Sequence, residues 1–300
     1  MRLLQPVDPP RGGERAPARS MPARRSPGAS DAGPRALRVR PGFGAAGCIV
    51  QRSDLTSHRI VVDQATLILV EDGCKRIRWS GGECIAHPGD ALSLQAGEVV
   101  DIANTPGRSG SYRALWLMWS AQRLAASGAA RPDAGPRVAK HAALGESFLD
   151  AFHRAFGALG DDRVPAAIAI HRLEEVLLWL GERGFHFAPP RPASIGQQVR
   201  RLLAADPATG WSVDRVARLL ATSAPTLRRR LAEEGVGFRG LVQDVRMLHA
   251  LALLQNTDLP VLHVALAVGY DSASRFSARF RARFGYLPSD VRGEGRRPRA

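Results

Sequence analysis

The feature that most constrains the fold is a phenylalanine repeat inside a strongly basic stretch near the end of the chain. Residues 269–292 read GYDSASRFSARFRARFGYLPSDVR, and Phe276, Phe280 and Phe284 recur every four residues. Residues four apart lie on the same side of an α-helix, so the repeat predicts one narrow apolar stripe with arginines on either side of it. Such a helix either has a solvated charged face or binds a polyanion.

The distribution of charge along the chain favours the polyanion. Residues 1–40 hold nine Lys or Arg against three acids, residues 41–195 hold sixteen of each, and residues 196–300 hold seventeen cations against nine acids. The basic character is therefore confined to the two ends of the chain. A basic C-terminal domain favours nucleic acid as a partner, because cations that contact phosphates release condensed counterions.

The composition of both ends of the chain predicts tails. Residues 1–41 are rich in Arg, Pro, Gly, Ala and Ser without apolar periodicity, which predicts a disordered basic tail. This segment is a solvated tail, an arm that touches DNA, or a stretch that is not translated because translation starts at Met21 or later. Residues 293–300 form a second basic tail. No apolar run reaches the roughly 20 residues of a membrane span, so we expect a cytoplasmic protein without membrane contact, associated with the nucleoid when bound to DNA.

Short β-rich runs separated by turn residues fill residues 42–125. The run RIVVDQATLILVEDG supplies β-branched and aliphatic residues, and glycine-containing turns recur after it. This pattern predicts a small β-barrel or jelly roll that serves as an effector-binding sensor domain. The effector is either a small molecule or a protein, and Trp79, Trp116 and Trp119 either line a cavity or belong to the core.

Two helices and a linker follow the barrel. Residues 140–186 predict a helix pair, with Phe148, Phe152 and Phe156 every four residues in the first helix. The second helix has an apolar side formed by Ile168, Leu173, Val176, Leu177 and Leu180. The pair either packs on the barrel or forms a homodimer interface within residues 143–185. The proline-dense residues 187–194 predict an extended interdomain linker.

From residue 195 the strand-like runs stop, and the pattern predicts an all-α domain over 195–292. Residues 212–235 have the layout of a helix-turn-helix unit in which Ser223 caps the second helix. On the outward face of that helix, Arg228 and Arg229 can contact base edges and phosphates. The competing interpretation is a solvated helix face, on which Arg230 pairs with Glu234.

A long helix over 238–258 leads to a second unit of the same kind. In this unit Pro260 starts a helix, Gly269 provides the turn, and Asp271 or Ser272 caps the helix that carries the phenylalanine repeat. Two such units joined by a rigid helix can enter two successive major grooves, roughly 34 Å apart on one face of the duplex.

These residues resemble the DNA-binding domain of the AraC/XylS family of bacterial transcription regulators. The family pattern is Gly-[Phe/Tyr]-x-Ser-x-Ser-x-Phe-x-Arg-x-Phe, then Gly-x-[Ser/Thr]-Pro, then Arg. The residues that match it here are Gly269, Tyr270, Ser272, Ser274, Phe276, Phe280, Gly285, Pro288 and Arg292. The resemblance implies an α+β two-domain protein with a cupin-like N-terminal barrel, a helical dimerisation segment, and a C-terminal domain with two helix-turn-helix units.

We expect the contacts with double-stranded DNA to come from both recognition helices. The first supplies Ser223, Pro225, Thr226, Arg228 and Arg229, and the second supplies Ser272, Ala273, Ser274, Arg275, Ser277, Ala278 and Arg279. By resemblance, the protein acts as a homodimer, contacts RNA polymerase, and activates rather than represses transcription.

One departure from the family pattern concerns the second recognition helix. The family usually has arginine at the position of Ala278, whereas here the arginine comes one residue later, as Arg279. Ala278 and Ser274 form a small, uncharged ridge, with Arg275 and Arg279 on its flanks. We therefore expect the first unit to read bases and the second chiefly to position the domain through phosphates.

An enzyme built on the barrel is the competing class. A bound metal needs three or four converging ligands, but the barrel segment holds only His58 and His87 and no His-x-His pair. The motifs GxSxG, P-loop and GxGxxG before a helix are also missing, so we expect no catalysis, metal or cofactor. The cysteines, Cys48, Cys74 and Cys84, have no CxxC spacing and are expected to be reduced, strand-borne small hydrophobic residues.

Overall fold

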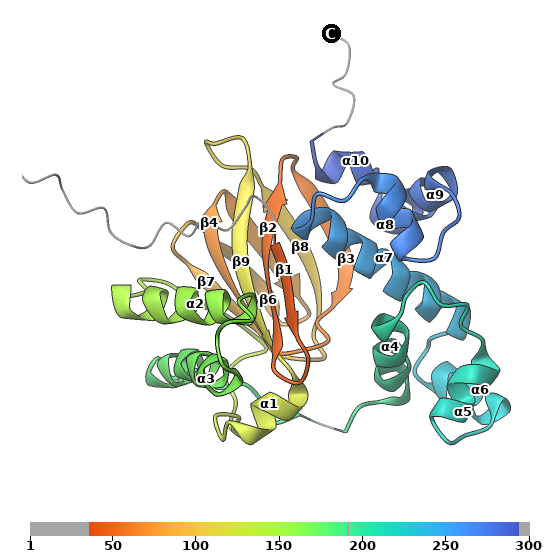
Figure 1. Cartoon of the computed structure of the whole chain (residues 1–300), viewed down its shortest axis with the longest axis horizontal. Helices are drawn as coiled ribbons and strands as arrows, with labels where there is room; N and C mark the ends of the chain where they lie inside the picture. The colour runs from red at the N-terminus through yellow and green to blue at the C-terminus, as the bar shows by residue number, and fades with distance from the viewer. Residues whose placement is uncertain (1–35, 191, 294–300) are drawn as a thin grey trace, which may run out of the picture. The chain divides into compact units, whose positions relative to one another are not determined.

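Two antiparallel sheets make up the N-terminal domain of the computed structural model, which describes residues 36–190 and 192–293 (Figure 1). The six-stranded sheet has the order β1 (Ala36–Arg40), β2 (Gly44–Gln51), β9 (Tyr112–Trp119), β4 (Thr66–Asp72), β7 (Ala91–Leu94) and β10 (Val138–His141). The four-stranded sheet has the order β3 (Leu55–Val61), β8 (Val99–Thr105), β5 (Cys74–Trp79) and β6 (Gly82–Ala86). The cysteines lie on β2, β5 and β6, as predicted.

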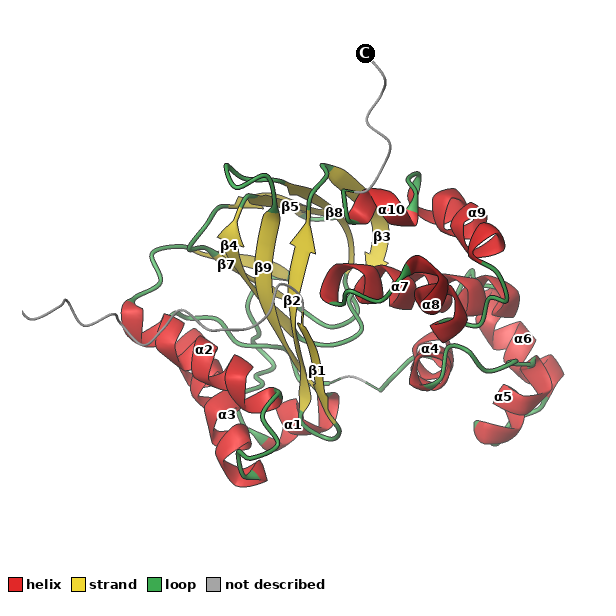
Figure 2. Cartoon of the chain, turned by 45° about the horizontal axis from the view of Figure 1, so that its top comes forward, coloured by secondary structure: helices red, strands yellow, loops and turns green. Residues whose placement is uncertain are grey.

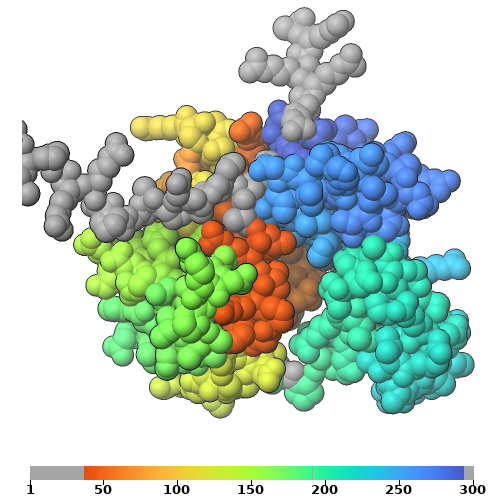
Figure 3. Space-filling model, viewed as in Figure 1, coloured from red at the N-terminus to blue at the C-terminus, as the bar shows by residue number. Residues whose placement is uncertain are grey.

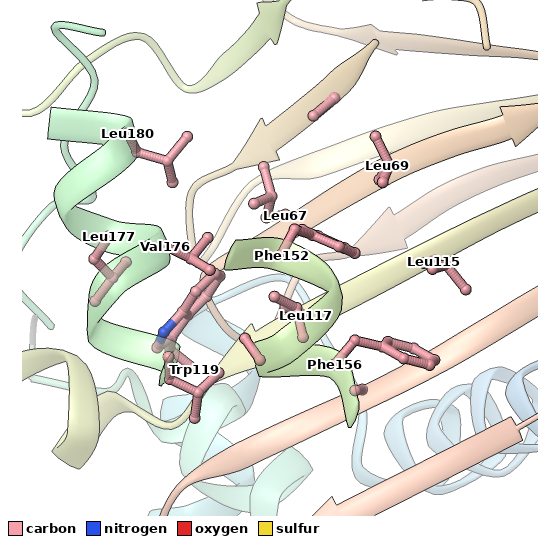
Figure 4. Close-up of a cluster of buried hydrophobic side chains, with 14 of the residues drawn as sticks. Leu67, Leu69, Leu115, Leu117, Trp119, Phe152, Phe156, Val176, Leu177 and Leu180 are labelled. Carbon is pink, nitrogen blue, oxygen red and sulfur yellow. The ribbon is translucent and has the colours of Figure 1, made fainter. Parts of the chain in front are cut away.

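The six-stranded sheet is buried on both faces because its strands carry apolar residues on both sides of the pleat. In β4, Leu67 and Leu69 belong to the core shared with helices, whereas Ile68 and Val70 belong to the core between the two sheets. The helices on the outer face are α2 (Glu146–Leu159) and α3 (Ala166–Glu182), and the short α1 (Ala121–Ala126) follows β9. Figure 4 shows Phe152 and Val176 of this pair directed toward Leu67 and Leu117 of the sheet.

The helix pair confirms most of the predicted apolar positions. Phe148, Phe152 and Phe156 are buried, so the repeat in α2 faces the sheet. Ile168 was expected on the inward side of α3 but is 43% exposed, and Ala169 is buried in its place. The reason is one of phase: successive residues of a helix point about 100° apart, and Ala169 shares its side with Leu173 and Val176.

The predicted N-terminal tail, residues 1–41, extends too far into the chain, because its last residues belong to the sheet. Residues 36–40 form β1, which pairs with β2 at the edge of the six-stranded sheet. The guanidinium of Arg38 donates to the carbonyl of Phe156, and that of Arg40 donates to the carbonyls of Ala158 and Val164. Figure 3 shows the surface of β1 against that of α2. Basic side chains at the carbonyl end of a helix are stabilising, so these arginines belong to the fold. The remainder of both predicted tails, 1–35 and 294–300, lies outside the described residues.

The sheet domain also extends past residue 125 and into the predicted linker. Strand β10 adds residues 138–141 to the six-stranded sheet. Phe187 is buried with its ring centroid 5.6 Å from that of Trp119, and it packs at 5.1 Å against Phe185. The proline-dense stretch therefore begins as part of this core, because Phe187 buries a large apolar side chain there.

The C-terminal part is all-helical (Figure 2). Its helices are α4 (Ile195–Ala205), α5 (Val213–Leu219), α6 (Ala224–Glu233), α7 (Phe238–Asn256), α8 (Val261–Ala267), α9 (Ala273–Phe284) and α10 (Pro288–Val291). Helices α5 and α6 form the first helix-turn-helix unit, α8 and α9 form the second, and α7 joins them. The predicted α+β two-domain class is thus confirmed.

Each helix-turn-helix unit has a core of its own. The first core contains Leu203 of α4, Val216 of α5, Leu227 of α6 and Val245 of α7. The second contains the three phenylalanines of α9 with residues of α7 and α8. Three residues of the sheet domain, Leu37, Leu55 and Ile60, pack against the second core and not against the first.

Candidate nucleic-acid interface and cavity

The first recognition helix, α6, presents its arginines outward. The hydroxyl of Ser223 accepts a hydrogen bond from the main-chain N–H of Thr226 at 3.3 Å, which confirms Ser223 as the N-cap. Leu227 is fully buried, so the neighbouring Arg228 and Arg229 point away from the core and are exposed. Pro225 and Ser223 are also exposed at the start of the helix. The five residues predicted for this helix therefore lie together at its N-terminal half.

The ion pairs of α6 differ from the pairing of Arg230 with Glu234 that the competing interpretation offered. Arg229 donates to the Glu233 carboxylate at 2.6 Å, and both side chains are more than half exposed. Glu234 instead accepts from the hydroxyl of Ser194 at 2.9 Å and from the main-chain N–H of Gly196 at 3.1 Å. A carboxylate is stabilised at the N-terminus of a helix, and Glu234 lies beside the first turn of α4.

The second recognition helix, α9, is held by the phenylalanine stripe. Phe276, Phe280 and Phe284 are all buried, which confirms the predicted apolar side. Of the two predicted caps, Ser272 is the one that caps the helix, accepting from the N–H of Arg275 at 3.4 Å. The helix ends at Gly285, which adopts the left-handed conformation at φ 86° that favours glycine.

The opposite side of α9 holds the predicted contact residues. Exposed on it are Ser274, Arg275, Ala278 and Arg279, while Ser272, Ala273 and Ser277 are half-buried. Ala278 thus lies on the exposed ridge between two arginines. The face can offer hydroxyl and guanidinium donors, which suit phosphate oxygens.

Arg246 of α7 fixes the two units to each other. Its guanidinium donates to the carbonyls of Pro207 at 2.9 Å and Thr209 at 3.0 Å, ahead of the first unit. It also donates to the carbonyl of Gly269 at 3.3 Å, in the turn of the second unit. Gly269 has φ 79°, and a Cβ there would lie 2.8 Å from the carbonyl oxygen of Ala208. The turn therefore requires glycine, and α7, about 28 Å long at the standard rise, sets the separation of the units.

A cavity of about 590 Å³ lies between the two sheets and helix α7. Of the three tryptophans considered, only Trp116 lines it, whereas Trp119 is buried in the core beneath α2 and α3. The indole N–H of Trp116 donates to the side-chain oxygen of Asn256, on α7, at 3.0 Å.

The cavity has a polar inner end that sequence reasoning missed. Lys75 of β5 is 1% exposed and donates from Nζ to the side-chain oxygen of Asn104 at 2.7 Å. Burial lowers the pKa of Lys75 to about 7. The amides of Asn104 and Gln255 both donate to the side-chain oxygen of Gln51, each at 3.2 Å. The one signal that the sequence carried was that Lys75 is one of two lysines beside forty arginines.

The histidines of the sheet domain do not form a metal site. His58 lies 3.0 Å from the Asp101 carboxylate on an exposed surface, and His87 is exposed in a turn. Across residues 36–190 and 192–293, no three His, Cys, Asp or Glu side chains are grouped so that they could hold a metal ion. Within the same residues, no helix combines the length and the apolar character needed to cross a membrane.

Comparison with known proteins places the C-terminal domain. Residues 216–294 match a family model described as a helix-turn-helix domain. The ornithine utilization regulator of Pseudomonas aeruginosa is 41% identical over 95 residues, which are 32% of this chain and 28% of that protein. The urease operon transcriptional activator of Escherichia coli is 34% identical over 112 residues, 37% of this chain and 36% of that protein. The match therefore spans about a third of the length of these relatives.

The whole fold is similar to that of ToxT from Vibrio cholerae. The ligand-free form of a ToxT variant with a single substitution superposes with a TM-score of 0.60 at 11% identity, over 84% of this chain and 97% of that one. The wild-type form bound to an unsaturated fatty acid gives 0.57 at 12% identity, over 84% and 96%. At this identity the likeness concerns the fold alone, and the sequence matches concern the helix-turn-helix region. The sequence matches therefore support the resemblance of residues 216–294 to the helix-turn-helix domain of AraC-type regulators.

Proposed function

We propose that this protein is a sequence-specific DNA-binding transcriptional regulator that reads two adjacent major grooves with α6 and α9. The observation that carries the proposal is the pair of helix-turn-helix units, each with arginines on its outward face and both held in one arrangement by α7 and Arg246. Arg228 and Arg229 would contact bases and phosphates, and Arg275 and Arg279 would contact phosphates. The names of the matched relatives, a regulator and a transcriptional activator, support this function over an enzyme.

The same proposal includes activation, dimerisation and contact with RNA polymerase in the cytoplasm. Activation is favoured by the activator role of the urease operon relative, and an activator bound beside a promoter would meet RNA polymerase there. A homodimer through the α2–α3 pair is supported by Leu178, which is 67% exposed on α3, and by the exposed Ile168. Leu178→Glu should shift the sedimentation coefficient toward that of a monomer, and an unchanged value would contradict this interface.

The sheet domain would sense an effector. A filled domain would favour a protein partner, whereas the cavity of about 590 Å³ with polar groups at its inner end favours a small molecule. The ToxT structure with an unsaturated fatty acid bound supports a ligand-binding role for this fold. In this chain the cavity is lined from both sides, by the sheets and by Leu248, Leu251 and Ala252 of α7, so a ligand there would touch the DNA-binding domain as well.

The function is tested by genome-wide footprinting of the full chain on the DNA of its own cell. We expect enriched sites with two elements centred about 10 base pairs apart, one helical turn of the duplex. The variant with both Arg228→Ala and Arg229→Ala should lose the enrichment while keeping the far-ultraviolet circular dichroism of the folded protein. Absence of any enrichment over random DNA for the unchanged protein would overturn the proposed function.

A further inference from the structure

The choice of lysine at the inner end of the cavity is the starting observation. The chain contains forty arginines and two lysines. Lys140 lies on the surface with an ion pair to Asp90 at 3.0 Å, whereas Lys75 is 1% exposed. Arginine stays charged inside a protein, whereas a buried lysine can gain or lose its proton near neutral pH. The lysine at this buried site can therefore change its charge, which an arginine there could not do.

Lys75 is incompletely satisfied as an ammonium. An ammonium has three N–H donors, and in the described part of the chain Nζ makes one hydrogen bond, to Asn104. None of the ion pairs among the described residues includes Lys75, and its other neighbour is the ring of Tyr112, 5.2 Å from Nζ. A buried charge is costly without an opposite charge, so the site is built to receive one.

The rest of the cavity fixes the kind of molecule that carries this charge. Around Lys75 the lining is apolar, from Ile49, Ile68, Ile102, Trp116 and Met118 of the sheets. A single ammonium balances one negative charge. A phosphate dianion would bring a second charge and more oxygens into this apolar surrounding, where the lining residues of the two sheets provide no second cation beside Lys75. Two arginines of α4 also line the cavity, but the guanidinium of Arg200 is paired with Asp244 at 2.7 Å, and Arg201 is exposed to solvent, which screens its charge.

We propose that the effector is an amphipathic monocarboxylate whose carboxylate binds the ammonium of Lys75 and whose apolar body fills the space between the sheets and α7. This assignment rests on the effector-sensing role proposed above. It also gives the ligand a route to the DNA-binding domain. The side-chain oxygen of Asn104 accepts from the ammonium of Lys75, and its amide N–H donates to Gln51. Gln51 also accepts from Gln255 of α7. A carboxylate on Lys75 competes with Asn104 and so disturbs this chain of hydrogen bonds.

The test compares carboxylates with alcohols of the same body by titration calorimetry on the full chain. The probes are decanoate, hexadecanoate and 4-phenylbutyrate, each paired with its alcohol. At least one carboxylate should bind tenfold or more tightly than its alcohol. Lys75→Met should lose that preference while still binding the alcohol, and Lys140→Met should retain it. Failure of all three carboxylates, alcohols that bind equally well, or an unchanged preference in Lys75→Met would each overturn the assignment.

Proton uptake separates a charge contact from a merely structural role. Because the pKa of Lys75 is about 7 without ligand, a carboxylate that raises it should cause uptake of close to one proton per ligand at pH 8. The other titratable groups around the lysine are Cys74 on its own strand and Tyr112, and Asp63, Arg200 and Arg201 line the same cavity. Uptake should persist in Cys74→Ser and Asp63→Asn and vanish in Lys75→Met.

The outcome for the ligand is independent of the outcome for DNA. The Lys75→Met protein should footprint the same DNA sites as the unchanged protein when no carboxylate is added. If footprints are present and carboxylate preference is missing, the ligand assignment fails and the proposed function stands. If footprints are missing for both proteins while the preference is present, the proposed function fails and the ligand site stands.

Discussion

The two helix-turn-helix units are built alike but are attached to the rest of the protein differently. The core of the first unit is formed by α4, α5, α6 and α7 with their connecting segments. The core of the second is extended by Leu37, Leu55 and Ile60 of the sheet domain. A cavity of about 570 Å³ separates β3 from Val236–Leu241, at the junction of the first unit with α7. The first unit is thus joined to the sheet domain less closely than the second.

Arg283 of α9 makes the attachment of the second unit specific. Its guanidinium donates to the carbonyls of His58 at 2.9 Å and Arg59 at 3.0 Å, and to the carboxylate of Asp244 at 2.7 Å. The two carbonyls lie in a bulge of β3, where Arg59 has a positive φ of 54°. Non-glycine residues hold this conformation only where contacts enforce it. A movement of the sheet domain would therefore displace α9 directly, and α6 only through α4 and α7.

The largest expected difference between the units concerns their cores. Phe280→Ala should lower the free energy of unfolding by about 3–5 kcal/mol, because it leaves a large cavity beneath α9. Amide hydrogen exchange should then quicken in β3 as well as in α9. Leu227→Ala should cost about 2–5 kcal/mol and quicken exchange in the helices of the first core, α4 to α7, but not in β3. Unchanged exchange in β3 of Phe280→Ala would contradict the shared core.

Arginine substitutions on the two recognition helices should separate base reading from positioning. Arg229→Ala should cost about 1–3 kcal/mol on the preferred site and little on random DNA, so sequence preference falls. Arg279→Ala should weaken binding on all sequences and reduce the slope of log affinity against log salt by about 1. The measurement is fluorescence anisotropy with both duplexes at several salt concentrations. An equal loss of specificity from both substitutions would show that the units read DNA alike.

The titration of Lys75 should make the free energy of unfolding depend on pH, most strongly in the elements near this residue. Its pKa is about 7 in the folded protein, against 10.5 for a lysine side chain in water, so the unfolded chain binds more protons between these values. Stability should therefore rise with pH, by roughly 1.5 kcal/mol between about pH 7 and pH 8.5. Urea unfolding of Lys75→Met should lack this rise. In the unchanged protein, amide hydrogen exchange, corrected for its intrinsic rate, should slow as the pH rises. The slowing should be larger in the sheets and α9 than in α6.

The smallest expected effect tests the attachment itself. Arg283→Lys cannot reach both carbonyls and the carboxylate at once, so it should cost about 1 kcal/mol of stability. Its more informative result is a selective increase of exchange in α9 without any in α6. Arg281→Lys, on an exposed position of the same helix, is the matched control and should change neither. Equal effects from the two substitutions would remove the role assigned to Arg283.

The C-terminal domain could be predicted from the sequence because its signals are local. The caps Ser223 and Ser272, the phenylalanine stripe and the glycine turn each act within a few residues, and all lie where they were expected. The pairing of Arg230 with Glu234, which the competing interpretation of α6 offered, does not form because Glu234 is attracted to the start of α4, a helix that lies well before it in the chain. That contact depends on tertiary packing, which a single helical wheel does not contain.

The sheet domain was less predictable because its signals are distant in sequence. The residues of β1 read as a basic tail, and only their pairing with β2 and the carbonyls at the end of α2 make Arg38 and Arg40 structural. Phe187 was hidden in a proline-rich stretch for the same reason. Lys75 carried no periodic signal, since a strand of alternating residues does not reveal that two sheets enclose a cavity at its end.

The contact between Trp116 and Asn256 has a consequence for exchanging parts between related proteins. Gly47 lies beneath this pair, and a Cβ there would come within 2.5 Å of the Asn256 side-chain oxygen and of the Trp116 ring. A small residue on β2, an indole on β9 and an amide on α7 must therefore change together. A hybrid that joins this sensor to a foreign DNA-binding domain at the linker would replace Asn256 and so lose its contacts with Trp116 and Gly47. The workable junction lies after α7, so that Asn256, its last residue, stays with the sensor.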